Sequence, residues 1–564
     1  MKNNRLKIIK SILATTVVFI AIIVLCMGFS RYSKRYYSQG EFEDWVITVN
    51  DYAPYTGTLY DESYKGFVYG DKITLQKMIT LPKDQDICVL RFFSRHFAEQ
   101  IYVNNELVYE NGLDSIEKGR AVGNHYAMAP LETDKDFCYI TIVLTVGDYK
   151  SRALPYVYIE NGFETTEHFN IDIFVDMIIA AIMVVIGVSM LFIMIVNKNF
   201  TKEYRKGIWI GAFALCVAGW TFCNYGILQT VVHNVYITYF ITEISLFMMP
   251  IPMMLFINEY QLPSMKKKIY SILIAMFIVF NIITFTLEVT GIYSYTYFVP
   301  LYQMMTIVAI VYSIIMLFGG VKDNVDNIYL LVGVVYFGLS CLYDLARSYY
   351  HSSEKVFNFT QSVVPVGAFM FFASMVIFYA NGVAKMFYRD AEQKMLFKLA
   401  YTDALTNLAN RAKCEEYAKE IDEDKENTYA VISLDLNGLK YVNDTYGHVD
   451  GDSFIIGFAE ILIAAFGKEK DSFIGRMGGD EFIVILKNCE PKKIQGLINN
   501  MNGMMHQINK EKSTENKFIF SAAYGVSIRT LEDTRKLWKV YEEADARMYE
   551  CKKYQRDRLG IRVR

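Results

Sequence analysis

Seven apolar segments in the middle of the chain place the strongest limit on how this sequence can fold. They cover residues 171–196, 207–230, 236–258, 269–291, 298–318, 328–350 and 361–383. A helix needs about 20 apolar residues to cross the hydrocarbon of a bilayer, so each segment is long enough to be a transmembrane helix. The 53% hydrophobic composition of the chain agrees with a membrane protein.

The N-terminus carries one further apolar run, residues 12–28, which follows four basic residues. This pattern fits either a signal peptide that is cleaved or a signal anchor that is kept. The sequence near Gly28 matches a small-residue cleavage site poorly, and the run approaches the length of a membrane span, so we favour the anchor. We therefore expect eight membrane helices, one within residues 1–37 and seven within residues 171–383.

The loops between the seven segments differ in their content of basic residues. Eight Lys and Arg residues fall in three of these loops, and one, Lys355, falls in the other three. The first set is 197–206, 259–268 and 319–327, and the second is 231–235, 292–297 and 351–360. Cytoplasmic loops are enriched in Lys and Arg, so the first set is expected in the cytoplasm. With the N-terminus inside, this predicts a multi-pass protein of the cell membrane.

Residues 38–170 have a different pattern and are expected outside the cell. Short β-rich runs such as 87–93 and 137–144 alternate with polar turn clusters, which is typical of an all-β sandwich or jelly roll. The only cysteines of this region, Cys88 and Cys138, lie in strand-like runs. An oxidising compartment permits a disulfide between them, and the alternative is two buried free thiols.

Residues 384–402 connect the last apolar segment to the C-terminal region. Apolar side chains recur there at helical spacing, at Ala384, Tyr388, Ala391, Met395 and Leu399. Either the last membrane helix extends beyond the bilayer, or this stripe pairs with a second copy as a signalling stalk. We favour pairing because a protruding helix has nothing else against which to bury the stripe.

The C-terminal region, residues 403–564, carries a group of carboxylates. Asp435 ends a β-rich run, and Gly478 and Gly479 separate two further apolar runs, which predicts a tight hairpin that presents Asp480 and Glu481. If the strands are neighbours, the three carboxylates lie together. Such a cluster suits divalent cations, because Mg²⁺ prefers oxygen ligands and bridges carboxylates to substrate phosphates. The pattern therefore indicates metal-dependent phosphoryl or nucleotidyl transfer.

The wider sequence resembles the diguanylate cyclase family, whose signature is a G-G-[DE]-E-F hairpin. The matching motifs, in chain order, are residues 403–411, 435–444, 446–448, 451–452, 476–482, 524–527 and 544–552. The resemblance implies an α/β domain with a five-stranded antiparallel, palm-like sheet. It also implies that two GTP molecules are condensed into cyclic di-GMP by two domains that face each other, so that a homodimer forms through the stalk and the catalytic domains.

The resemblance assigns roles to individual residues. It implies that Asp435 and Asp480 bind Mg²⁺ or Mn²⁺ with the carbonyl of Leu436, and that Asp480, assisted by Glu481, deprotonates the attacking 3′-hydroxyl. The implied substrate-binding residues are Asn443 and Asp452 for guanine, Lys440, Lys552 and Arg556 for phosphate, and Gly478 and Gly479, which let the nucleotide approach the backbone. Structural roles are expected for Asp403, Asn410, Arg411 and His448.

Three departures from the family pattern stand out. Asn437 occupies a position where aspartate is common, and Gln555 stands where glycine often precedes the arginine. Many family members also carry an R-x-x-D motif that binds the product as a feedback inhibitor. This chain has Glu469 and Ser472 at its two key positions, so we expect the product to bind weakly there.

The N-terminal half resembles, in its architecture, the bacterial seven-transmembrane receptors with diverse intracellular signalling modules. In that family the outer domain senses small ligands, and no residue here identifies the ligand. The leading hypothesis is therefore a diguanylate cyclase regulated by an extracellular or membrane signal. The alternative is a non-enzymatic receptor that binds GTP or cyclic di-GMP. The net charge of −3 gives no reason to expect a nucleic-acid partner.

Overall fold

A computed structural model describes most of the chain in two compact units, Met1–Lys385 and Met386–Arg564. The described residues are 43–59, 67–81, 88–131, 137–148, 154–196, 206–261, 264–322, 324–349, 362–423, 428–511 and 519–559. The predicted signal anchor in residues 1–37 lies outside these ranges.

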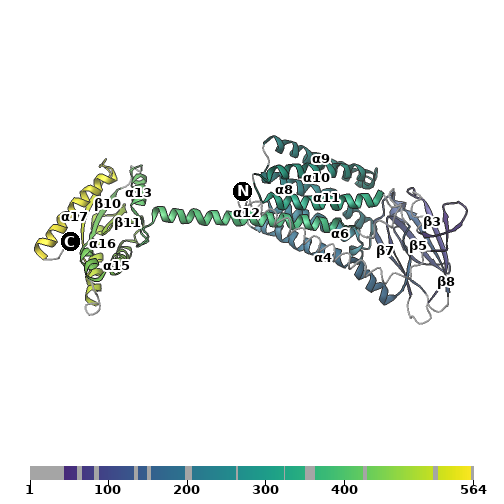
Figure 1. Cartoon of the computed structure of the whole chain (residues 1–564), viewed down its shortest axis with the longest axis horizontal. Helices are drawn as coiled ribbons and strands as arrows, with labels where there is room; N and C mark the ends of the chain where they lie inside the picture. Colours follow the sequence, from purple (N-terminus) through teal and green to yellow (C-terminus); the bar gives the residue numbers. More distant parts are fainter. Residues whose placement is uncertain are drawn as a thin grey trace. The chain divides into compact units, whose positions relative to one another are not determined.

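The first unit begins with two antiparallel sheets (Figure 1). The larger has the strand order β2-β1-β3-β8-β5-β6, and the smaller has the order β7-β4-β9. The strands are β1 Trp45–Val49, β2 Tyr55–Gly57, β3 Lys72–Thr80, β4 Cys88–Ser94, β5 Phe97–Val103, β6 Glu106–Asn111, β7 His125–Leu131, β8 Phe137–Val146 and β9 Tyr158–Asn161. The short helix α3, Leu113–Glu117, follows β6.

The strands form because apolar residues alternate along them and share one face. In the β3–β8 pair, Ile73 lies opposite Leu144 and Leu75 lies opposite Ile142, and all four side chains are fully buried. Side chains from both sheets contribute to a single hydrophobic core. Within this core Cys88 and Cys138 are buried free thiols rather than a disulfide, and burial raises the pKa of both.

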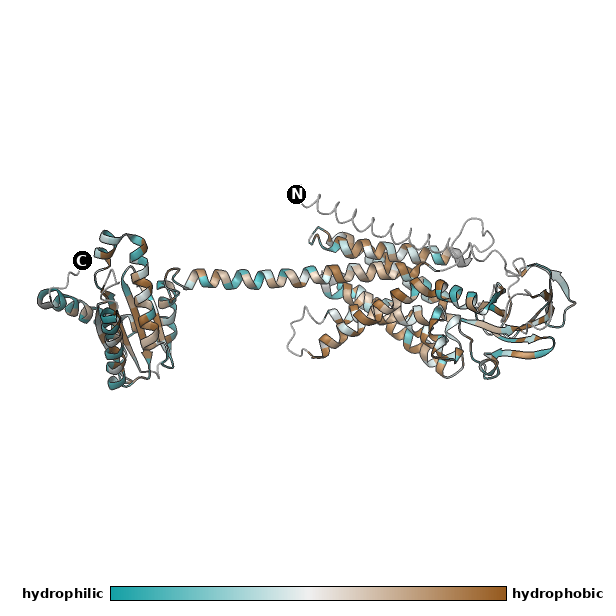
Figure 2. Ribbon diagram, turned by 90° about the horizontal axis from the view of Figure 1, so that it is seen from below, coloured by the Kyte–Doolittle hydropathy of each residue, from teal (hydrophilic) through white to brown (hydrophobic). Residues whose placement is uncertain are grey.

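Among the described residues, seven helical segments are long and apolar enough to cross a membrane. The helices involved are α4 Gly162–Val196, α6 Gly207–Asn224, α7 Val235–Met248, α8 Pro250–Gln261, α9 Ser264–Val289, α10 Val299–Gly320, α11 Asn327–Tyr349 and α12 Val364–Tyr401. α7 and α8 together make one span, Val235–Glu259, and α8 begins at Pro250, which has no N–H to continue the preceding helix. Figure 2 shows how apolar residues dominate these helices.

Two boundaries differ from those expected from hydropathy. α4 begins at Gly162 rather than near residue 171, because Asn161 Oδ1 accepts a hydrogen bond from Glu164 N (2.7 Å) and starts the helix in a polar segment. α12 continues without a break from the last apolar segment through the expected stalk to Tyr401. Hydropathy detects only the apolar part of α4, whereas the helical spacing of apolar side chains had indicated that residues 384–402 are helical, as α12 is.

The β-rich part of the first unit contacts the helices through β7 and the loop before it. The side chain of Gln229 accepts a hydrogen bond from Tyr126 N (2.7 Å) and donates one to Tyr126 O (3.3 Å), so it pairs with the edge of β7 as a strand would. A Cβ on Gly123 would lie only 2.8 Å from Val235 O and 2.9 Å from Tyr239 N, so this glycine packs directly on the backbone of α7.

The second unit contains a four-stranded antiparallel sheet with the order β11-β12-β10-β13. Its elements are α13 Arg411–Glu423, β10 Tyr429–Leu436, α14 Leu439–Tyr446, α15 His448–Phe466, β11 Ser472–Gly478, β12 Glu481–Lys487, α16 Pro491–Glu511, β13 Ala522–Arg529 and α17 Leu537–Leu559 (Figure 1). The resemblance implied five strands, whereas four are present in the described residues of this unit.

The central strand β10 explains the layered arrangement of this unit. All eight of its residues are buried, and they alternate between two cores. Ala430, Ile432 and Leu434 pack with α15 and α16, while Tyr429 and Val431 pack with α13 and α17. Helices therefore cover both faces of the sheet, and Asp435, the second-last residue of β10, lies between the neighbouring strands β12 and β13.

Candidate active site

The hairpin between β11 and β12 forms as the sequence predicted. Gly478 pairs with Glu481, so Gly479 and Asp480 make the turn. Gly479 has a φ of +51°, a conformation that glycine adopts without steric cost. A Cβ at Gly478 or Gly479 would meet no atom within 4 Å, so the backbone here is open to a ligand.

Asp435 lies beside this hairpin. It pairs with Glu481 across the β10–β12 ladder, and Leu436 N donates a hydrogen bond to Asp480 O (2.9 Å). The structure thus brings together Asp435, Asp480, Glu481 and the backbone of Leu436. These are the residues expected to form the metal and catalytic centre.

The carboxylates influence one another. Burial raises the pKa of Asp435, the nearby charge of Asp480 raises it further, and the ammonium of Lys552 opposes both. Burial also raises the pKa of Glu481, with added repulsion from Asp480 and Asp545. Asp545, on α17, was missed as a member of this group, although it lies in the matched motif at residues 544–552.

Lys552 lies on the carboxylate of Asp435. Its Nζ is 2.7 Å from Oδ1 and 2.8 Å from Oδ2. Lys552 is also on α17, so the sequence-predicted phosphate ligand does reach the carboxylate cluster, but it pairs there with a predicted metal ligand. In the part of the chain that the structure describes, no three metal-ligating side chains converge on one point. Two carboxylates and a carbonyl still form an all-oxygen donor set that suits Mg²⁺ once phosphate oxygens complete it.

The remaining predicted substrate residues lie on neighbouring helices. Lys440 is exposed on α14, and Asp452 is exposed on α15. Asn443 packs against Gly451, where a Cβ would overlap its carboxamide, so the two predicted guanine-binding residues lie close together. Arg556 is exposed and pairs with Asp557 (3.3 Å), so the structure does not bring it to the carboxylates.

Arg476 contacts the hairpin turn, and the sequence did not single it out as a site residue. Its Nε and Nη2 donate to Gly479 O (3.0 and 2.7 Å), and its Nη1 donates to Asp403 Oδ1 (3.0 Å). Asp403 also accepts from the backbone and hydroxyl of Thr406 (2.9 and 2.7 Å). Although burial opposes it, these donors lower the pKa of Asp403. Asp480 belongs to the turn that Arg476 contacts. Arg476 therefore links this turn to Asp403, in the segment that follows α12.

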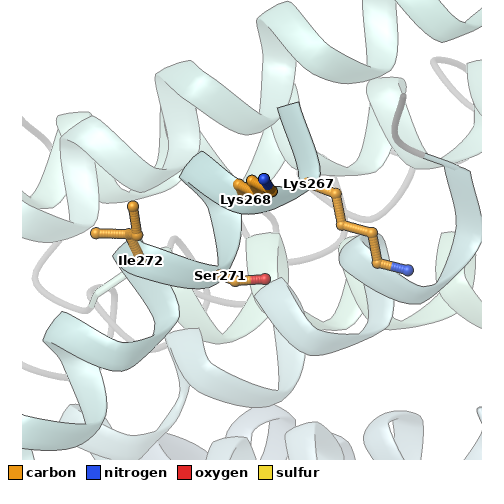
Figure 3. Close-up of a pocket in the computed structure, with 4 residues that line it drawn as sticks. All are labelled: Lys267, Lys268, Ser271 and Ile272. Carbon is orange, nitrogen blue, oxygen red and sulfur yellow. The ribbon is translucent and has the colours of Figure 1, made fainter. Parts of the chain in front are cut away.

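A separate pocket lies in the first unit at the start of α9 (Figure 3). It has a volume of about 530 Å³ and is lined by Lys267, Lys268, Ser271 and Ile272. The two lysines suit an anionic group, but these lining residues include no carboxylate that could hold a metal or accept a proton. The pocket is therefore not a candidate active site.

The second unit is an α/β domain in which acidic residues lie at a glycine hairpin of an antiparallel sheet covered by helices. Residues 400–558 match the family model described as "Diguanylate cyclase, GGDEF domain". This part of the chain is a GGDEF domain.

Several known proteins are similar to this part of the chain. Diguanylate cyclase DgcS of Shewanella oneidensis is 29% identical over 171 residues, which is 30% of this chain and 53% of that protein. Diguanylate cyclase DgcN of Escherichia coli is 28% identical over 174 residues, 30% of this chain and 41% of that protein. The coiled coil and GGDEF domain of DgcB from Caulobacter crescentus, in complex with c-di-GMP, is 24% identical, with a TM-score of 0.29 over 32% of this chain and 95% of that chain. The chain thus spans about half, or less, of the length of these curated relatives.

Proposed function

We propose that this protein is a membrane-bound, receptor-type diguanylate cyclase that converts two GTP into cyclic di-GMP and two diphosphates. The observation that carries the proposal is the complete carboxylate group of Asp435, Asp480 and Glu481, assembled on an open glycine hairpin. A degenerate, non-enzymatic member of the family would be expected to have lost one of these carboxylates.

The proposed reaction joins two nucleotides through two phosphodiester bonds. In each step the 3′-oxygen of one GTP attacks the α-phosphorus of the other, the bond to diphosphate breaks, and the hydroxyl proton passes to Asp480. Glu481, next in the chain, assists as a neighbouring acceptor. Bound Mg²⁺ or Mn²⁺ supplies charge neutralisation at the phosphates. Asp435, Asp480 and the Leu436 carbonyl would hold the cation, and Lys552 would transfer from Asp435 to the triphosphate.

The substrate would be read by residues at the end of α14 and the start of α15. Asn443 and Asp452 provide an amide and a carboxylate, which match the acceptor and donor edges of guanine. Lys440 and Arg556 are exposed cations that would contact phosphate oxygens. Each domain would hold one GTP, so two copies must meet for the bonds to form.

The stalk supports assembly into a homodimer. On α12 the apolar side chains of Tyr388, Met395 and Leu399 are between 65% and 78% exposed, beyond the part of the helix that packs in the bundle. Such a stripe is stabilised when a second copy covers it. We propose that the stalks pair and that their arrangement sets how often the two catalytic domains meet.

We further propose that the β-rich domain faces the outside and controls the enzyme through the helices. The argument for orientation is the bias of basic residues in the loops. The argument for control is the direct contact of the β7 edge with Gln229 and of Gly123 with α7. A small ligand that moved this edge would move the helix bundle, although the residues do not identify that ligand.

Replacement of Asp480 by asparagine in the full chain, reconstituted in nanodiscs, tests the proposed site. Turnover should fall by about 10²–10³-fold or more, because a charged group is removed where charge develops in the reaction. Asp471→Asn is the matched control, since Asp471 lies at the other end of the same hairpin with a φ of +65°, which asparagine also adopts. An Asp480→Asn protein that keeps more than about a tenth of the control rate would refute the assignment.

A further inference from the structure

Two of the residues that depart from the family pattern contact each other in the folded domain. Asn437 Nδ2 donates a hydrogen bond to Gln555 Oε1 (2.8 Å), although the two residues are 118 positions apart. The same Nδ2 donates to Ser521 Oγ (3.2 Å), and Gln555 Nε2 donates to Ala522 O (3.2 Å). Gln555 therefore bridges the loop after β10 to the start of β13.

The side chains of Asn437 and Gln555 are complementary as hydrogen-bond donor and acceptor. The side chain of an aspartate at 437 would have no N–H to donate, and a glycine at 555 would have no side-chain oxygen to accept a hydrogen bond. The asparagine and the glutamine together make a hydrogen bond that neither common residue could make. Asn437 is almost fully buried, and its Nδ2 makes both of its side-chain hydrogen bonds, to Gln555 and Ser521.

The bridge lies between two parts of the proposed site. Asn437 directly follows Leu436, whose carbonyl is the expected metal ligand, and its own N–H is bonded to Ser521 O (2.9 Å). Gln555 is one helical turn beyond Lys552 on α17, on the same side of the helix. On the other side of Lys552, α17 is attached to β10 by Ser433 Oγ, which donates to Asp545 Oδ1 (3.0 Å) and lies 3.5 Å from Met548 Sδ, one helical turn before Lys552.

We infer that Gln555 is a positioning residue, which, with Asn437, fixes the distance between the Lys552 segment of α17 and the Leu436 loop. Without the bridge, Lys552 lies beyond the last attachment of α17 to β10, and its ammonium has a wider range of positions. This inference rests on the proposed function, because it assigns the bridge a role in holding the GTP phosphates.

The consequence is specific to substrate binding. Lys552 has to leave Asp435 and meet the triphosphate, and it does so efficiently only if the helix backbone stays in place. Loss of one buried hydrogen bond should weaken GTP binding by about three- to tenfold. The rate at saturating GTP should change little, since the carboxylates that perform the reaction are on β10 and the hairpin.

The test uses the full chain in nanodiscs with the variants Gln555→Met, Asn437→Ala and the double variant. Methionine preserves the length and helix propensity of glutamine but removes both hydrogen bonds. Gln507→Met is the matched control, because Gln507 is an exposed glutamine on α16 whose side chain bonds only within its own helix, to Glu511. The readouts are KM and kcat for GTP, calorimetric binding of a non-hydrolysable GTP analogue with Mg²⁺, and the melting temperature.

We expect the analogue to bind about three- to tenfold more weakly to either single variant. We expect the loss in the double variant to be clearly smaller than the sum of the two single losses, because the two residues share the Asn437–Gln555 hydrogen bond. Additive losses, or a lower melting temperature with KM and analogue affinity unchanged, would reduce the bridge to a structural contact and overturn the inference. If the unaltered protein neither binds the analogue nor converts GTP, the proposed function fails and this inference fails with it.

Discussion

The clamp that Arg476 places on the catalytic turn allows a quantitative prediction. Replacement of Arg476 by lysine keeps the positive charge but provides only one nitrogen. The guanidinium makes two hydrogen bonds to Gly479 O and one to Asp403, and its side chain is only 12% exposed. Lysine can keep at most part of this set, because its ammonium cannot span both acceptors as a planar fork does.

The size of the effect follows from the bonds that are lost. A hydrogen bond that involves a charged group contributes about 1.5–3 kcal/mol, and partial exposure of Asp403 favours the lower part of this range. A loss in the lower part of this range, about 1.5–2 kcal/mol of the free energy that holds the turn, corresponds to a fall of about 10- to 30-fold in kcat/KM, since Asp480 is next to Gly479. The melting temperature of the catalytic domain should fall by only a few degrees.

The assay is cyclic di-GMP formation by the full chain in nanodiscs, with kcat/KM taken from initial rates. Arg411→Lys is the control, because Arg411 is 71% exposed and makes only a surface pair with Glu415. An Arg476→Lys protein whose kcat/KM stays within about twofold of this control would show that the hairpin holds Asp480 in place without the clamp. The argument from geometry would then be wrong.

Three further predictions concern regulation and stability. Added cyclic di-GMP should not slow the reaction at low micromolar concentration, because Glu469 replaces the arginine of the feedback motif. Glu469 is paired with Lys493 at 2.5 Å. Inhibition that disappears on mutation of residues 469–472 would contradict this prediction. His125 is buried, which opposes its protonation, but the carboxylate of Glu99 outweighs burial and raises its pKa. The stability that this pair contributes should be complete below about pH 6.5 and lost as the pH rises through the raised pKa of His125. The prediction would be refuted if the melting temperature of the β-rich domain rose with pH over this range. It would also be refuted if the His125→Gln protein showed the same pH dependence. Gly123→Val should destabilise the contact with α7 by about 1–3 kcal/mol and alter the basal rate of cyclic di-GMP formation, since the valine Cβ would meet the helix backbone. An unchanged melting curve and an unchanged rate would exclude this contact as the route of control.

Local patterns in the sequence were sufficient to predict those parts of the structure that depend on hydropathy or on tight turns. The seven apolar segments correspond to seven helical spans, and the Gly478–Gly479 pair does form the turn of a hairpin. Asp435 was expected beside that hairpin, and the β10–β12 register places it opposite Glu481. These features rest on residue spacing and on backbone conformation, both of which can be derived from neighbouring residues.

Contacts between distant segments could not be derived in this way. Arg476 and Asp403 are 73 residues apart, and Asn437 and Gln555 are 118 apart, so no periodicity connects them. The attachment of the β7 edge to Gln229 also depends on how the β-rich domain packs on the helices. Burial and register decide such contacts, and they become visible only when the chain is folded.

The central claim is that this chain joins two GTP molecules into cyclic di-GMP. The most direct measurement is to incubate the purified full-length protein in nanodiscs with GTP and Mg²⁺ and to identify the nucleotide products by liquid chromatography and mass spectrometry. The account predicts cyclic di-GMP, with two diphosphates released for each molecule formed, and a rate of formation at least about 100-fold lower with the Asp480→Asn protein. Stable binding of GTP with no cyclic di-GMP would contradict the account and would favour a receptor that binds the nucleotide without turning it over.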